Sequence, residues 1–221
     1  MPSERKSRTV QRTSFHDPVG DMILQSVEQH WRSLRKGADV PQRIDFMPGP
    51  MSECLAHCFM LERVRPSVAR IRVAGQAIHT LLKMDPRGMP MSVLFTPAGR
   101  QMLAPIVNDV CENAAIFEVP LTANRGLGRS LLKGRLLLLP LRHDGDAINR
   151  LLGALVVDGR IGRRTLRFDF DQNVATRTQT IQPVIRTVHE IMSEPADIVV
   201  LPPRMKRQGP RPALRLVVDN G

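Results

Sequence analysis

The chain has 221 residues, a hydrophobic content of 42% and a formal net charge of +11. This length suits one full hydrophobic core with flanking segments, or two very small domains. The longest strongly apolar run, at 136–141, is interrupted by Pro140 and is far shorter than the roughly 20 residues that cross a bilayer. The basic N-terminus has no apolar stretch behind it, so we expect a cytoplasmic protein without a membrane partner.

The large positive charge raises the question of nucleic-acid binding. The excess is spread along the sequence rather than concentrated in one element, and the chain has one Trp and no Tyr for base stacking. We therefore interpret the charge as a solvated basic surface and do not expect nucleic acid as the main partner. A nucleic-acid accessory protein that uses basic arms is kept as an alternative function.

Three cysteines are too few for a disulfide framework, and an odd number of them cannot all be paired within the chain. Cys54 and Cys58 flank His57, but no fourth ligand follows at a suitable spacing, so we predict no metal site. We also see no pairing of a nucleophile with a base. The sequence therefore predicts a protein that is not an enzyme.

Residues 1–19 have no hydrophobic periodicity and are predicted to form a disordered basic arm. Asp17 followed by Pro18 is a favoured start of a helix. An amphipathic helix ending near Gly37 is predicted by apolar residues at helical spacing, namely Ile23, Val27, Trp31 and Leu34. Its apolar face needs a surface to cover, either the domain's own sheet or a second copy of the chain.

The most informative predicted strand covers residues 68–74. Arg70 and Arg72 alternate there with Ile71 and Val73, the period of a half-buried strand. We expect Ile71 and Val73 to face the core, and Arg70 and Arg72 to face solvent or a partner. Gly75 follows, where the absence of a Cβ permits a sharp turn into a helix.

The other elements follow from periodicity and turn signals. They are a loop at 40–51, a strand at 58–64, helices at 76–83 and after Thr96, and strands at 115–122, 130–142 and 150–158. This order, with antiparallel hairpins at its end, predicts an α+β fold.

The character of the sequence changes beyond Phe170. A second amphipathic stripe precedes a basic tail and consists of Ile181, Ile185, Val188 and Met192. We therefore divide the chain into a disordered arm (1–19), a domain (20–168) and a C-terminal extension with one amphipathic helix (169–221).

The order of elements resembles that of PAS domains, and short motifs add to the resemblance. In chain order they are Trp31 with Leu34 and Arg35, Gly37, Pro41-x-Arg43, F-M-L-E from Phe59, the R-I-R-V-A-G strand, Gly88, L-L-P-L from Leu138 and R-L-L-G-A-L from Arg150. The resemblance covers about residues 22–158. It implies a five-stranded antiparallel sheet with short helices on one face, in addition to the N-terminal helix. It also implies a bacterial sensory and regulatory protein that signals by changing its contacts.

Within such a domain, the helix at 76–83 and the loop behind it form the wall of a small pocket or of a packed core. The candidate ligand-pocket residues are Ile78, His79, Leu82, Met89, Phe95, Leu137, Leu139 and Leu155. An apolar ligand site and a filled core both fit such a wall. His79 could serve as an axial haem ligand, which leaves a small-molecule or haem carrier as an alternative function. The sequence identifies no cofactor.

The flanks show no kinase histidine box and no helix-turn-helix pattern, so we expect the protein to act through protein partners or as a homodimer. The candidate partner-surface residues are Trp31, Arg35, Arg70, Arg72, Ile185 and Val188. The two amphipathic helices around Trp31 and Ile185 are the expected contact surfaces.

Arg63 and Arg65 recur on the first predicted strand. If the two strands pair, these residues would join Arg70 and Arg72 in a basic patch partnered by Glu62. Such a patch either binds an acidic partner or a phosphate group, or is a solvated and ion-paired sheet face.

Overall fold

The computed structural model describes residues 17–181, apart from residues 38, 48, 127, 128, 144 and 146. The chain divides into two units, Met1–Val184 and Ile185–Gly221, and every described residue lies in the first. The helices are α1 (Pro18–Ser33), α2 (Gln76–Leu82) and α3 (Pro97–Glu112). The strands are β1 (Cys58–Arg65), β2 (Val68–Ala74), β3 (Ala115–Ala123), β4 (Leu132–Arg142), β5 (Ile148–Asp158), β6 (Phe168–Phe170) and β7 (Arg177–Thr180). No helix of this described part is long and apolar enough to cross a membrane.

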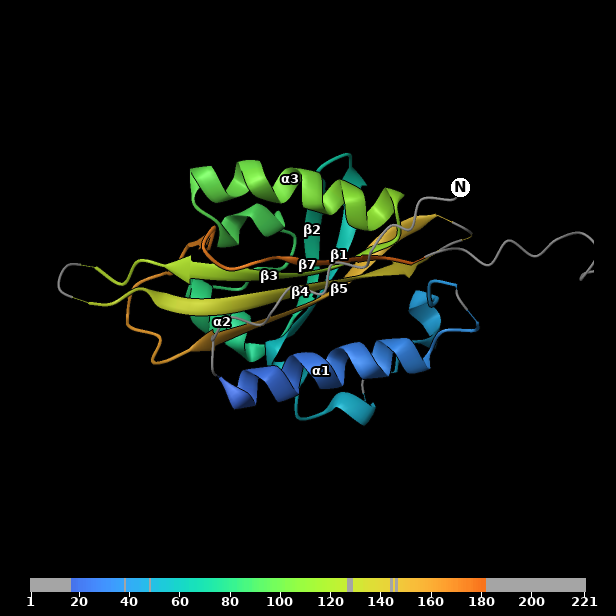
Figure 1. Cartoon of the computed structure of the whole chain (residues 1–221), viewed down its shortest axis with the longest axis horizontal. Helices are drawn as coiled ribbons and strands as arrows, with labels where there is room; N and C mark the ends of the chain where they lie inside the picture. The colour runs from blue at the N-terminus through green and yellow to red at the C-terminus, as the bar shows by residue number, and fades with distance from the viewer. Residues whose placement is uncertain are drawn as a thin grey trace, which may run out of the picture. The chain divides into compact units, whose positions relative to one another are not determined.

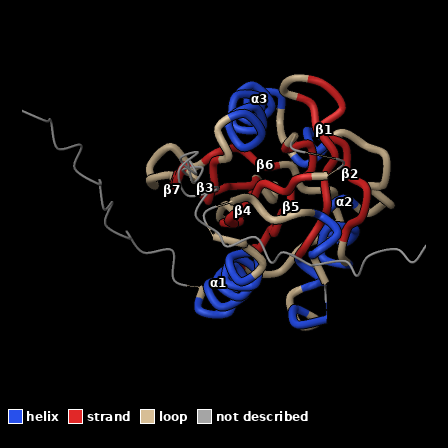
Figure 2. The backbone as a smooth tube through the Cα atoms, turned by 90° about the vertical axis from the view of Figure 1, so that its right-hand side faces the viewer, coloured by secondary structure: helices blue, strands red, loops and turns tan. Residues whose placement is uncertain are grey.

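The strands form one antiparallel sheet, and its core has the order β2-β1-β5-β4-β3. These are the five predicted strands, so the predicted α+β fold is confirmed. The structure adds β6 and β7, which were not predicted. They pair with the two halves of β3, at 121–123 and 115–118 respectively, and continue the sheet beyond it. Figure 2 shows the sheet as the layer between α1 and α3.

The sheet carries a helix layer on each face (Figure 1). Side chains of α2 and α3 pack with one face in a large apolar cluster, and side chains of α1 pack with the other face in a second cluster. Leu136 and Leu138 belong to the α3 side, whereas Leu137 and Leu139 belong to the α1 side. Successive side chains of a strand point to opposite faces, so the apolar run of β4 serves both cores.

Helix α1 begins after Asp17 with Pro18 in its first turn, as the sequence predicts. Its Leu24, Val27 and Trp31 are buried against the protein's own sheet. Trp31 is 0% exposed, and its indole Nε1 donates a 2.8 Å hydrogen bond to the Pro140 carbonyl on β4. The assignment of Trp31 to a partner surface is therefore wrong, because the sheet of the same chain already covers the apolar face of α1.

Strand β2 departs from simple alternation at its end. Ile71 is 0% exposed, as expected, but Val73 is 59% exposed. The pairing of β1 with β2 shifts between Met60↔Val73 and Leu61↔Ile71, so Arg72 is an extra residue on β2. Such a bulge reverses the side of the sheet on which the following residues lie. The expectation that Val73 faces the core is therefore wrong.

Gly75 connects β2 to α2 as predicted, but glycine is required there by a close contact between backbone segments and not by the backbone conformation. Its φ of −76° is open to any residue. A Cβ at this position would lie only 2.0 Å from the carbonyl oxygen of Leu55. Glycine is therefore needed because two backbone segments approach each other closely.

Candidate functional site

The predicted pocket wall on the α3 face is filled by its own side chains. Ile78, Leu82 and Phe95 are 0%, 2% and 1% exposed, and they belong to one apolar cluster with Leu155. Interiors packed in this way approach the density of organic crystals. The four predicted pocket residues Ile78, Leu82, Phe95 and Leu155 therefore lie together, but they form a packed core.

The other four predicted pocket residues lie elsewhere. Leu137 and Leu139 pack against α1 on the opposite face of the sheet, so their assignment to this wall is wrong. His79 and Met89 are half-buried. The carbonyl of Met89 accepts a 2.9 Å hydrogen bond from the Ile71 amide, so the backbone at this point borders the edge of β2.

A surface depression of about 440 Å³ lies along α3. It is lined by Pro105, Ile106, Asn108, Asp109, Glu112, Asn113 and Phe117, none of which is among the predicted site residues. One of its walls is tied to the β1–β2 hairpin: Arg63 Nη2 lies 2.5 Å from Glu112 Oε1, and the Ser67 amide donates a 2.6 Å hydrogen bond to Asn108 Oδ1. These contacts fix α3 against β1 and β2.

The predicted basic patch on β1 and β2 is divided by the sheet. Arg63 turns to α3 and pairs with Glu112, whereas Glu62 on the other face pairs with Arg72 and with Arg150 of β5. Burial raises the pKa of Glu62, but Arg72 and Arg150 outweigh this effect and hold the pKa below its ordinary value. The expectation of one continuous patch is therefore wrong, because neighbouring residues of a strand face opposite ways.

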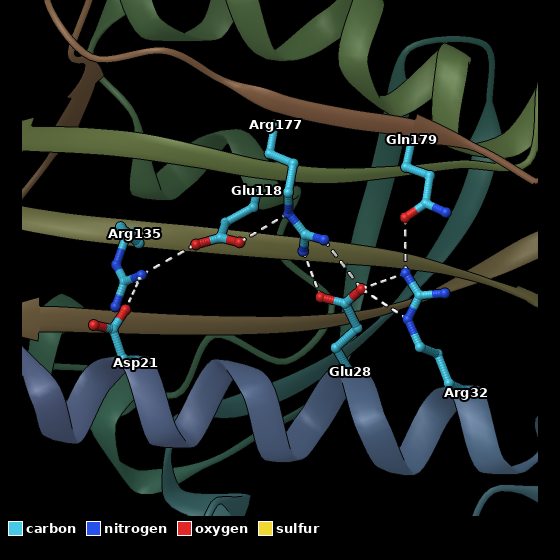
Figure 3. A network of polar contacts seen from close by, with 7 residues as sticks. All are labelled: Asp21, Glu28, Arg32, Glu118, Arg135, Arg177 and Gln179. Carbon is cyan, nitrogen blue, oxygen red and sulfur yellow. Dashed lines mark hydrogen bonds and ion pairs between the residues drawn. The ribbon is translucent and has the colours of Figure 1, made fainter. Parts of the chain in front are cut away.

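A polar network joins α1 to the sheet and is called the α1 network below (Figure 3). It consists of Asp21, Glu28 and Arg32 of α1, Glu118 of β3, Arg135 of β4, and Arg177 and Gln179 of β7. At one end, Arg135 Nη1 lies 2.5 Å from Asp21 Oδ1 and 3.1 Å from Glu118 Oε1. Arg135 thus links the first turns of α1 to the neighbouring strand.

Glu28 is the centre of the other end of the network. Its Oε1 lies 2.7 Å from Arg32 Nη2 and 3.1 Å from Arg177 Nη1, and Arg177 Nε in turn lies 3.1 Å from Glu118 Oε2. Arg32 Nη2 also donates a 2.8 Å hydrogen bond to Gln179 Oε1. Of these contacts, only the Glu28–Arg32 pair at i,i+4 has a signal in the sequence. Strand β7 is polar and exposed, so no sequence pattern indicates that it supplies Arg177 and Gln179.

The carboxylate of Glu28 is held in its charged form. Its burial raises the pKa, but the hydrogen bonds and charges of Arg177 and Arg32 outweigh this and keep the pKa below its ordinary value. For Arg177, burial lowers the pKa, while Glu28 and Glu118 raise it above its ordinary value. Both partners are therefore ionised in the folded protein, and each stabilises the other.

Of the other predicted partner-surface residues, Arg35 covers the buried indole. Its guanidinium lies 5.7 Å from the centre of the Trp31 ring, and its Nε donates a 3.1 Å hydrogen bond to the Asp39 carbonyl. Arg70 and Arg72 are both exposed on β2. Ile185 and Val188 lie outside the described residues.

The cysteines are buried thiols. Burial raises the pKa of Cys58 to about 12, and the nearby Cys54 adds to this effect. Burial also raises the pKa of Cys111 to about 11. A thiol with so high a pKa is a poor nucleophile and a poor metal ligand. The part of the chain that the structure describes holds no cluster of three His, Cys, Asp or Glu residues suited to a metal ion.

The sequence matches the family model of the PAS domain over residues 20–156. No curated protein matches it. Among solved structures, the LOV protein of Rhodobacter sphaeroides is similar, with 12% sequence identity, a TM-score of 0.37, and coverage of 64% of this chain and 71% of that chain.

Proposed function

We propose that this chain, which belongs to the PAS domain family, is a non-enzymatic cytoplasmic regulatory protein that acts through protein–protein contacts. PAS domains are generally sensory and regulatory modules. Our proposal extends this general role in two ways: the protein signals through its surface, and it holds no small molecule.

The packing beneath α2 is the observation that carries the proposal. Ile78, Leu82 and Phe95 occupy the space between the helices and the sheet, and each is at most 2% exposed. Apolar ligand sites are concave and largely preformed, whereas these side chains pack against one another. A protein with a filled interior has to exchange information at its surface.

The outer face of α1 is our proposed contact surface. Val19 and Met22 are 66% and 68% exposed, and because they are three residues apart they lie on the same side of the helix. The opposite side of α1 is fixed to the sheet by Trp31 and by the α1 network. A partner, either a second copy or another protein, would therefore meet a helix whose orientation is already set.

Native mass spectrometry and an absorbance scan of the purified full chain test the filled interior. We expect the mass of the polypeptide alone and no absorption band beyond that of the protein. A stoichiometric bound molecule or a haem band would show that the interior accepts a ligand, and would overturn this part of the proposal.

Site-specific photo-crosslinking in cells tests the contact surface. A photoreactive residue at Met22 is expected to give a discrete crosslinked species, identified by mass spectrometry as a second copy or as one particular protein. The matched control places the same residue at the exposed Gln101 on α3, on the other face of the sheet. No product at Met22, or the same product at both positions, would contradict a contact through α1.

A further inference from the structure

Two basic loops meet at one end of the sheet. Because β4 and β5 are antiparallel neighbours with Lys133 opposite Asp158, the loop that precedes β4 and the loop that follows β5 lie at the same end. Figure 1 shows this end at the left, where the yellow-green β3–β4 hairpin and the orange segment after β5 lie. We call residues 124–126, 129–133 and 158–167 the basic tip. Its cationic residues are Arg125, Arg129, Lys133, Arg160, Arg163, Arg164 and Arg167, and its sequence contains one carboxylate, Asp158.

The two loops of the basic tip are in close contact. Arg125 donates hydrogen bonds of 3.0 and 2.8 Å to the carbonyl and hydroxyl oxygens of Ser130, which fixes its own loop. Its Nη1 would lie 3.8 Å from a Cβ at Gly159, and Arg129 Nη1 would lie 3.7 Å from a Cβ at Gly162. Guanidinium groups from the first loop thus reach the backbone of the second, so the two loops and their cations lie side by side at this end of the sheet.

Most of this charge is exposed and uncompensated. Arg129, Arg160, Arg163 and Arg164 are exposed. Within the described ranges, none of these four arginines forms an ion pair, and the same holds for Arg125 and Arg167. Like charges held together without counterions repel one another, and an anionic partner removes this repulsion.

We propose that the basic tip binds the phosphate backbone of a nucleic-acid duplex. The tip presents mainly arginines, whose planar fork of donors matches the oxygens of a phosphate group. Its sequence contains no aromatic residue, so it lacks the stacking platforms used for unpaired bases. Contacts to the backbone position a protein on a duplex without reading its bases. This inference does not depend on the proposed contact through α1.

Two other anionic partners are less well matched. A membrane surface usually takes an apolar anchor beside the cations, and Leu131, at 56% exposed, is the one exposed large apolar side chain among the described residues of the tip. An acidic protein would be held by complementary surfaces with an apolar centre. A cluster that is almost purely cationic favours the regular array of phosphates along a duplex.

Fluorescence anisotropy of the full chain with a labelled duplex of about 20 base pairs, over about 50 to 200 mM salt, measures this binding. The test variant combines R129S, R160S, R163S and R164S, which remove exposed side chains without ion pairs. We expect the wild type to bind and to weaken steeply with salt. The variant is expected to bind at least about tenfold more weakly at low salt, with a salt slope shallower by about 0.9 for each lost phosphate contact.

A matched control removes the same number of charges from the C-terminal segment, through R204S, K206S, R207S and R211S. We expect this variant to keep more of the duplex affinity than the tip variant, and circular dichroism to show that both variants are folded. The proposal is overturned if the wild type does not bind at low salt, or if the tip variant binds as tightly as the wild type. It is also overturned if the tip substitutions abolish binding to phosphatidylserine vesicles or polyglutamate while duplex binding is unchanged.

Discussion

The α1 network and the basic tip use the same side chain in opposite ways. In the network, Arg135 and Arg177 each contact two carboxylates that belong to different elements. In the tip, Arg129, Arg160 and Arg163 are exposed and form no ion pair with any described residue. The difference shows that the arginines of this chain cannot be treated as one basic surface. One group holds the fold together, and the other is available to a partner.

The two groups also differ in their effect on stability. The side chains of Arg135 and Glu28 are 12% and 13% exposed, so removing a partner leaves a charge in a poorly hydrated place. An exposed charge without a partner is hydrated in the folded and unfolded states alike. Substitutions around α1 should therefore change the free energy of unfolding, whereas substitutions in the tip should change binding.

The largest effect is expected from Trp31→Ala, which removes the apolar contact that lies beside the α1 network. The indole is fully buried and its Nε1 bonds to the Pro140 carbonyl, so we expect a loss of about 3 to 5 kcal/mol in the free energy of unfolding. Urea unfolding monitored by circular dichroism measures it. Trp31→Phe, which keeps an aromatic ring but loses the hydrogen bond, should cost less. A loss below about 1 kcal/mol for Trp31→Ala would show that α1 is not an integral part of the fold.

A smaller effect is expected from Glu28→Gln, which removes the carboxylate at the centre of the network. Arg32 and Arg177 then lose a charged acceptor, and we expect a loss of about 1 to 3 kcal/mol in the free energy of unfolding. The control is Glu112→Gln, which breaks the pair with Arg63. Because Glu112 is 58% exposed, its loss should be below about 1 kcal/mol. Equal losses in the two variants would contradict the distinction between the network and an ordinary surface pair.

The pH dependence of the same variant sharpens this test. Because the folded state lowers the pKa of Glu28, its stabilising effect is complete above the ordinary pKa of a glutamate and is lost as the pH falls through the lower folded value. The wild type should therefore lose more stability than Glu28→Gln between about pH 7 and about pH 3. Urea unfolding across this range measures the difference. Parallel curves for the two proteins would show that Glu28 is not held in its charged form.

The sequence predicts much of the fold but not the assignment of residues to its two faces. Periodicity and cap signals locate the start of α1 and both ends of β2 and α2 within a residue, whereas α1 ends at Ser33, before the predicted stop near Gly37. The bulge at Arg72 leaves no mark in the sequence, and it moves Val73 to the exposed side. The apolar run of β4 has no alternation, so it could not show that Leu137 and Leu139 face α1. Both errors arise because strand register and sheet coverage depend on contacts between distant segments.

The same limit explains why both arginine groups escaped prediction. The α1 network joins Glu28 to Arg177, which are 149 residues apart in the chain. In the basic tip, Arg129 lies close to Gly162 only because β4 and β5 pair. Along the sequence the positive charge looks evenly spread, and only the sheet topology concentrates it at one end.

The smallest effect on stability is expected from the combined R129S, R160S, R163S and R164S variant of the basic tip. None of these arginines forms an ion pair with a described residue, so folding gains nothing from their charge. We expect the free energy of unfolding to stay within about 0.5 kcal/mol of the wild type in urea, or to rise as repulsion is relieved. A loss comparable to that of Glu28→Gln would mean that the tip arginines serve the fold. If stability is unchanged and duplex binding is weakened, the charge of the tip serves binding alone, because a residue that stabilises the fold cannot be removed without a cost in unfolding free energy.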